Sequence, residues 1–143
     1  MKPSLKLVNK VLELKSKGEN DIVDITERVQ QLIEDEKFED GFATLFVVGS
    51  TAAITTIEFE PGLRKDFPAM LERIAPKNLV YEHEKTWHDD NAHSHVRASL
   101  IGPSLTVPIV AGRMTLGTWQ QIVFIELDTR SRERKVEVQM LGE

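Results

Sequence analysis

Apolar and polar residues alternate along much of this chain, which is the pattern of β-strands with one buried face. The alternation predicts strands over residues 5–14, 44–48, 53–59, 79–81, 105–109, 119–128 and 135–140. Small residues at 49–52 predict a turn or bulge between the second and third of these strands. The last three strands are expected to form an antiparallel meander, and the charged turn at 129–134 is expected to face solvent.

Three other stretches are predicted to be helical. Apolar residues recur at helical spacing over 22–33 and 67–74, and a third helix is predicted over 92–100. Asp66 is expected to cap the second helix and Asn91 the third, because short polar side chains accept hydrogen bonds from helix N-terminal amides. Two or three helices among many antiparallel strands predict an α+β domain with a large, mainly antiparallel sheet.

Length, charge and composition narrow the class of protein further. The 143 residues suit one domain over 1–143, and the net charge of −5 argues against a nucleic-acid binder. No apolar run approaches the roughly 20 residues that span a bilayer, and the N-terminal residues do not resemble a signal peptide. A cytoplasmic location is therefore expected. Cysteine is absent, so any metal must be held by histidine and carboxylate.

All four histidines fall within a short segment, at His83, His88, His93 and His95. Neutral imidazole is the commonest protein ligand for metals, so the clustering predicts a metal site. The alternative is a solvated polar loop. On a helix, residues two apart face different ways, so only one of His93 and His95 could bind; on an extended segment both could.

Other residues have side chains suited to a small substrate. Ser50 and Thr51 could donate hydrogen bonds to a phosphate, or they could simply form a turn. Glu58 could act as a general base or hold a ligand imidazole, or it could be an exposed carboxylate. Trp119 and Gln120 offer a stacking face and an amide for a flat heterocycle, or they could be a core tryptophan beside a solvent-facing amide.

Four segments together resemble one protein family. These are Gly49–Thr55, Asn91–His95, Gly102–Ser104 and, most specifically, Leu116–Gln120. They resemble the YjbQ family, also called the secondary thiamine-phosphate synthase family. The resemblance implies a large antiparallel sheet, a homotrimer, and sites between subunits around a bound zinc. It also implies weak joining of a hydroxymethylpyrimidine pyrophosphate to a thiazole phosphate, which forms thiamine phosphate.

The resemblance implies metal ligands at His83 and His95. Many relatives carry a further histidine where this chain has Gly49, and His88 or His93 could supply the third imidazole in its place. His88 is the third choice of ligand and His93 the last. The predicted substrate-binding residues are Ser50, Thr51, Asn91, Trp119 and Gln120, with Glu58 as the catalytic candidate.

Two functions from different classes follow. The first is a metal-binding homotrimeric enzyme that acts on a small phosphorylated or heterocyclic substrate, with thiamine-phosphate synthase activity as one form of it. The second is a non-catalytic ligand-binding or assembly protein whose histidines stabilise a subunit junction. Both predict self-association and a small-molecule ligand, and neither predicts nucleic acid or membrane as a partner.

Overall fold

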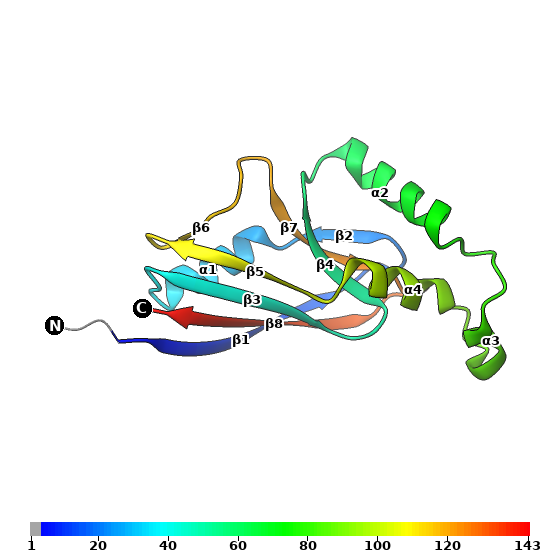
Figure 1. The fold of residues 1–143 in the computed structure, drawn as a ribbon, viewed down its shortest axis with the longest axis horizontal. Coiled ribbons are helices and arrows are strands. Elements are labelled where there is room, and N and C mark those ends of the chain that lie inside the picture. The colour runs from blue at the N-terminus through cyan, green and yellow to red at the C-terminus, as the bar shows by residue number, and fades with distance from the viewer. Residues whose placement is uncertain (1–3) are drawn as a thin grey trace.

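The computed structural model describes residues 4–143, which form two antiparallel sheets with helices at both ends (Figure 1). The larger sheet has the order β1-β8-β3-β5-β6 and the smaller one the order β2-β7-β4. The strands are β1 (Lys6–Lys15), β2 (Asp21–Asp24), β3 (Gly41–Val48), β4 (Ala52–Ile57), β5 (Ser104–Val110), β6 (Arg113–Met114), β7 (Gln121–Glu126) and β8 (Glu133–Gly142). The helices are α1 (Thr26–Asp35), α2 (Pro61–Ile74), α3 (Glu82–Trp87) and α4 (Ala92–Ile101).

The main core lies on the inner face of the larger sheet. Alternate residues of its strands are fully buried there, as Leu45 and Val138 illustrate, because successive side chains of a strand point to opposite faces. Helix α1 adds Val29 and Ile33 to this core, and Phe124 of β7 joins it from the smaller sheet. The two sheets therefore share one hydrophobic interior.

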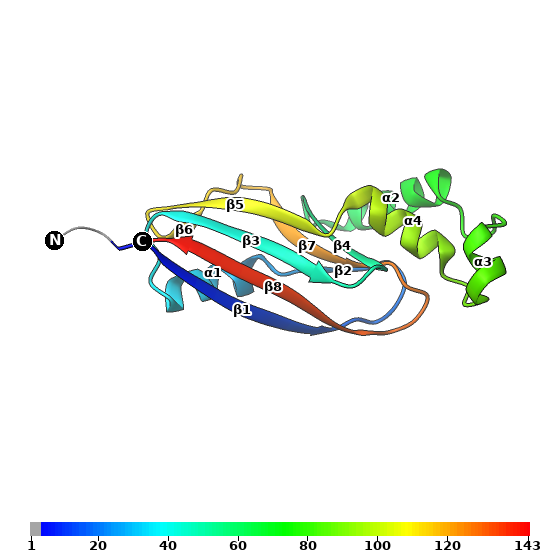
Figure 2. The same cartoon turned by 60° about the horizontal axis from the view of Figure 1, so that its bottom comes forward.

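A second, smaller core holds the other helices in place. Leu71 of α2 and Ala98 of α4 pack with Val123 and Ile125 of β7. Figure 2 shows α2, α3 and α4 gathered at one end of the sheets, while α1 lies toward the other end. The histidine segment belongs to this helical end. No helix within residues 4–143 is long and apolar enough to cross a membrane.

The outer face of the larger sheet carries an apolar row. Leu7, Leu141, Phe42 and Pro108 lie side by side across four strands, because Leu7 and Phe42 both pair with Leu141 and Phe42 also pairs with Pro108. Leu7 and Phe42 are 62% and 42% exposed, and Phe46 on the same face is 46% exposed. A row of this kind is unusual on a solvated sheet face.

The predicted α+β class is confirmed, but the start of the first helix was wrong. Residues 21–24 form β2, and α1 begins only at Thr26. The strand forms because it pairs with β7, with Ile22 opposite Ile125. Asp24 then accepts hydrogen bonds from the backbone and the hydroxyl of Thr26, which starts the helix.

The second helix also begins earlier than predicted. It starts at Pro61 instead of after Asp66, because the Glu60 carboxylate accepts hydrogen bonds from the N–H groups of Gly62 and Leu63. The predicted strand at 79–81 is absent, and the short helix α3 follows instead. The described part of the chain has four helices where two or three were expected, and three of them are substantial.

The predicted meander of the last third was also wrong. β5 and β6 form a hairpin, but β7 pairs with β2 and β4 in the smaller sheet. β8 then returns to the larger sheet, between β1 and β3. The chain thus changes sheets between residues 126 and 133, which brings the charged turn close to the helical end.

Candidate functional site

Helices α3 and α4 bring two histidines into contact. The ring centroids of His83 and His95 lie 4.6 Å apart with planes inclined at 45°. The corner between the helices is held by Glu84, whose carboxylate accepts hydrogen bonds from the N–H groups of Asp90 at 3.0 Å and Ala92 at 3.3 Å. A carboxylate is favourable there because N-terminal helix amides lack intrahelical partners.

A third side chain, Asp89, lies beside His83. Its Oδ1 lies 3.4 Å from Nδ1 of His83, and one ligand atom from each of His83, Glu84 and Asp89 falls within 4.8 Å of the others. Nδ1 of His83 and Oδ1 of Asp89 are both shielded from solvent, and neither has a hydrogen-bond partner within residues 4–143. Oδ1 of Asn91 is buried and unpartnered in the same way. These atoms can all accept, so they suit a bound cation.

The environment of His95 favours its neutral, ligating form. Burial lowers the pKa of His95 below its ordinary value of 6.5, and the neighbouring His83 lowers it further. Asp89 and Asp128 act in the opposite direction but are outweighed. A neutral imidazole keeps the lone pair that a metal requires.

His93 lies on the other side of α4 and is used differently. It is buried and ion-paired with Glu19, which Lys77 also contacts at 3.1 Å. Burial alone would raise the pKa of Glu19, but its hydrogen bonds with His93 and Lys77 outweigh this and lower it. His88 ends α3 with a φ of 55° and is exposed, outside the group formed by His83, Glu84 and Asp89.

A small pocket of about 180 Å³ lies beside His95. One wall is the turn between β3 and β4, with Gly49 and Ser50, and the opposite wall comes from α4, with Ser99. Thr51, the next residue of the turn, points into the protein. Its hydroxyl donates to Oδ2 of Asp128 at 3.0 Å and accepts from Nη2 of Arg134 at 2.7 Å.

Arg134 and Asp128 belong to a buried polar network that the sequence-based prediction missed. Nε of Arg134 donates to Glu126 at 2.9 Å, and Oγ of Ser16 donates to the same carboxylate at 2.7 Å. Residues 130–133 of the turn predicted to face solvent are exposed, but Arg134 at its end is only 8% exposed, and the preceding Asp128 is fully buried. A signal was available, because Arg134 has the same alternating, inward position as the buried Val136 and Val138.

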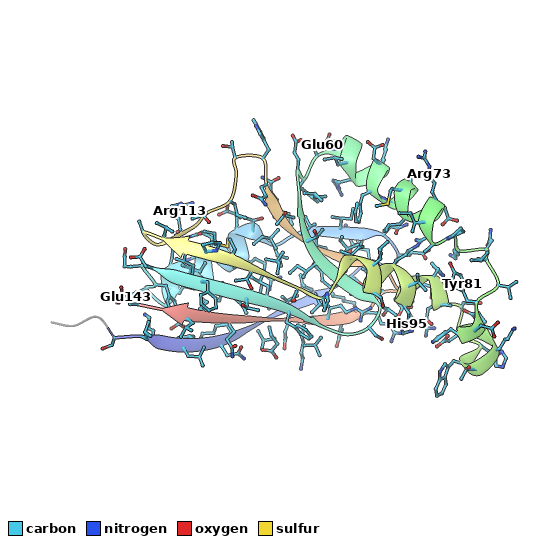
Figure 3. All side chains as sticks on the ribbon, in the orientation of Figure 1. Glu60, Arg73, Tyr81, His95, Arg113 and Glu143 are labelled. Carbon is cyan, nitrogen blue, oxygen red and sulfur yellow. The ribbon has the colours of Figure 1, made fainter. Side chains whose placement is uncertain are left out.

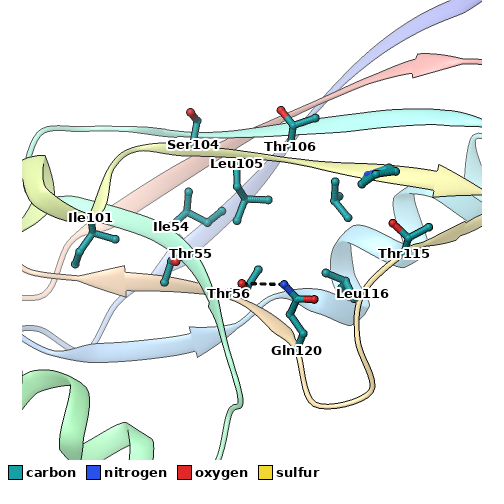
Figure 4. A pocket seen from close by; sticks show the side chains of 12 residues that line it. Ile54, Thr55, Thr56, Ile101, Ser104, Leu105, Thr106, Thr115, Leu116 and Gln120 are labelled. Atoms are coloured by element: carbon teal, nitrogen blue, oxygen red, sulfur yellow. Dashed lines mark hydrogen bonds between the residues drawn. The ribbon is translucent and has the colours of Figure 1, made fainter.

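The remaining predicted site residues lie elsewhere in the chain. Glu58 is exposed just beyond the far end of β4; Figure 3 shows the nearby Glu60 at the opposite end of this strand from His95. Gln120 donates to Oγ1 of Thr56 at 3.1 Å and accepts from the N–H of Gly117 at 3.0 Å. It lines a separate groove of about 310 Å³ between β4 and β5 (Figure 4). Trp119 is 72% exposed.

Solved structures with this arrangement of strands and helices are known. A YbjQ-like protein of unknown function from Sulfolobus solfataricus is 33% identical, with a TM-score of 0.91 over 98% of this chain and 100% of that one. A hypothetical protein from Aeropyrum pernix is 31% identical, with a TM-score of 0.87 over 95% and 99% of the two chains. The fold therefore defines a class of small α+β proteins whose functions are not established.

The sequence identifies the family. Residues 10–143 match the family described as UPF0047 protein YjbQ-like. A UPF0047 protein from Methanothermobacter thermautotrophicus is 40% identical over 92% of this chain and 90% of its own length, and YugU of Bacillus subtilis is 32% identical over 93% and 98%. The chain belongs to the YjbQ/UPF0047 family, as the resemblance predicted.

The buried network should make stability depend on pH through Asp128. Burial alone would raise the pKa of Asp128, but the Thr129 N–H, the Thr51 hydroxyl and Arg132 hold it below its ordinary value of 3.8. The ionised carboxylate thus stabilises the fold fully above about pH 3.8 and progressively less as the pH falls through the lowered value.

We expect Asp128→Asn to lower the free energy of unfolding at pH 7 by about 1–3 kcal/mol, because charge-assisted hydrogen bonds are lost. The difference in the free energy of unfolding between Asp128→Asn and the wild type should shrink below about pH 3.8. Urea unfolding at several pH values measures both effects. Asp66→Asn, at an exposed helix position, is the control and should change stability by less than about 0.5 kcal/mol. A pH-independent loss in Asp128→Asn would contradict the assignment.

Proposed function

We propose that this protein is a metal-dependent enzyme that acts on a small phosphorylated or heterocyclic substrate. The observation that supports it best is the pair of shielded, unpartnered atoms, Nδ1 of His83 and Oδ1 of Asp89, next to His95. Buried polar atoms without partners are costly unless an ion or water satisfies them. Two imidazoles and a carboxylate are a typical donor set for catalytic zinc.

Asp89 replaces His88 as the third ligand in this proposal. Asp89 converges with His83 and Glu84, and Glu84 already accepts hydrogen bonds from the N–H groups of Asp90 and Ala92. His95 and His88 both lie outside this group, but only His95 contacts the ring of His83, and His93 is committed to Glu19. The chain lacks a side chain at Gly49, so a carboxylate completes the set instead of a further imidazole. Such a metal would polarise a phosphate oxygen or lower the pKa of bound water to about 7.

The chain's own residues would orient the ligands. Glu84 fixes the segment that carries Asp89, through its hydrogen bonds to the N–H groups of Asp90 and Ala92. The ion pair of His93 with Glu19 and that of Arg97 with Glu72 hold the other face of α4. His95 is thereby held against His83. Ligand side chains that are already fixed favour tight binding, because little conformational entropy is lost when the metal binds.

A homotrimer would account for two exposed features. Nothing within residues 4–143 covers the apolar row around Phe42, and Trp119 is exposed, away from the histidines. We propose that the outer sheet face packs against a second copy, and that the Trp119 and Gln120 loop of one copy adjoins the histidines of another. The substrate's heterocycle would then stack on Trp119.

The second candidate is a non-catalytic assembly protein whose histidines join subunits. One observation favours it: Glu58, the predicted general base, lies exposed beyond the far end of β4 from the pocket beside His95. In this case the metal would contribute stability alone. Melting the protein with and without a chelator, beside an activity assay, separates the two functions.

For the metal centre, we expect His83→Ala and His95→Ala to weaken zinc binding by more than about 100-fold, since loss of even an outer-sphere partner costs roughly 10–100-fold. Asp89→Asn should weaken binding by at least about tenfold. Competition with a chromogenic chelator measures each affinity. His88→Ala is the matched control and should bind zinc like the wild type. Full loss in His88→Ala with retention in Asp89→Asn would overturn the ligand set.

For the activity, we expect zinc-loaded protein to form thiamine phosphate slowly from hydroxymethylpyrimidine pyrophosphate and thiazole phosphate. His95→Ala should lose this turnover by at least about 100-fold, because the metal that polarises the substrate is gone. Product formation is followed by chromatography. Equal trace turnover in wild type and His95→Ala would favour the non-catalytic function.

For the assembly, we expect Phe42→Asp to reduce the mass in solution from that of three chains toward that of one. A buried, unpaired carboxylate at the centre of the apolar row would cost more than the interface can offset. Light scattering coupled to size-exclusion chromatography measures the mass. Leu79→Asp, at an exposed apolar position outside the row, is the control. An unchanged trimer in Phe42→Asp would place the interface elsewhere.

A further inference from the structure

The turn between β3 and β4 has unused hydrogen-bond donors. Within residues 4–143, the backbone N–H groups of Gly49, Ser50 and Thr51 make no hydrogen bond, and the Ser50 hydroxyl makes none either. Gly49 and Ser50 are exposed and Thr51 is buried, so the free donors of the first two lie at the surface, where a ligand can reach them. Successive N–H groups in a turn form concave sites that bind anions.

A cation lies directly beneath this turn. A Cβ at position 49 would come within 2.6 Å of Nη1 of Arg134, so the guanidinium takes the space that a side chain would need. The other two nitrogens of Arg134 bond Glu126 and Thr51, whereas Nη1 has no partner within the described residues. Gly49 also has a φ of 153°, which suits glycine.

The buried network keeps the turn in this shape. Thr51 is held on both sides, by Asp128 at 3.0 Å and by Arg134 at 2.7 Å, and its carbonyl accepts from the N–H of Leu127 at 3.0 Å. The charges of Glu126 and Asp128 balance those of Arg132 and Arg134 around it. An anion would therefore be attracted by the N–H donors of the turn and not by a net positive charge. Binding through several donors favours a ligand with several acceptor oxygens.

We propose that residues 49–51 form an oxyanion site beside His95, for the phosphate group of a small ligand. The three N–H groups match the three terminal oxygens of a phosphate monoester, whereas a carboxylate offers only two. The adjoining pocket of about 180 Å³ is smaller than sites for drug-sized ligands, so it suits one end of a substrate. This inference adds to the proposed function the position of the substrate's phosphate.

The site can be tested without the metal. Uniformly nitrogen-15-labelled protein in the presence of a chelator is titrated with inorganic phosphate, methyl phosphate or acetate at constant ionic strength, and backbone amide shifts are followed. Saturable shifts centred on residues 49–51 are expected with at least one of the two phosphates. Binding of methyl phosphate indicates a phosphate ester as the ligand, and binding of inorganic phosphate alone indicates the free anion. Equal binding of acetate, or shifts centred elsewhere, would overturn the proposal.

Two variants test the geometry. Gly49→Ala should weaken phosphate binding at least tenfold, because the new Cβ meets Arg134. The double variant Arg134→Gln with Glu126→Gln keeps a neutral hydrogen-bonded pair, and it should also weaken binding several-fold. Arg113→Gln, at an exposed arginine, is the control and should leave binding unchanged. Wild-type affinity in both test variants would refute the site. Zinc titrations without phosphate test the metal centre separately, so the two proposals can fail independently.

Discussion

The buried ion pair of Arg134 and Glu126 is the interaction on which the arrangement of this protein most depends. Two charges removed from water are stable only when they are paired and their remaining hydrogen bonds are satisfied. Glu126 meets this requirement with donors from Arg134, from Ser16 and from the backbone of Asp128. The pair therefore joins β7, β8 and the end of β1, and through Thr51 it reaches the β3–β4 turn. These segments come from both sheets, so the pair fixes the corner at which the sheets meet.

Helix α4 connects this corner to the histidines, and it does so with two different faces. Residues two apart on a helix are separated by about 200° around its axis. His93 therefore faces inward to Glu19, while His95 faces His83 and the pocket. The inward face is anchored by charged contacts, because Arg97 also bonds Glu72 and the carbonyl of Ala75. An anchored helix can present His95 with little freedom, which a ligand to a metal needs.

Features set by residues close together in the sequence were predicted, whereas features set by distant residues were not. The strands β1, β3 and β8 alternate clearly because each has one buried face, and the histidine cluster is visible because its members are close in sequence. Residues 21–24 were misassigned because Ile22 and Ile25 fit either a helix or a strand, and only pairing with β7 decides between them. The Arg134 network was missed because its partner Ser16 lies more than a hundred residues away from it. The proximity of Asp89 to His83 was not predicted for a different reason: it depends on the α3–α4 corner, where Glu84 accepts a hydrogen bond from the N–H of Asp90.

The separation of Trp119 and Gln120 from the histidines has a consequence for the proposed site. Within one chain, Gln120 is already bonded to Thr56 and Gly117, and it lines a groove apart from the pocket at His95. An exposed tryptophan costs solvation free energy and contributes no packing to its own chain. Its exposure is understandable if another copy covers it. Within residues 4–143, the apolar row on the larger sheet is also exposed, and the same proposed assembly would cover it. The proposed assembly would account for both features, with the proposed metal ligands on one chain and the stacking face of Trp119 on the next.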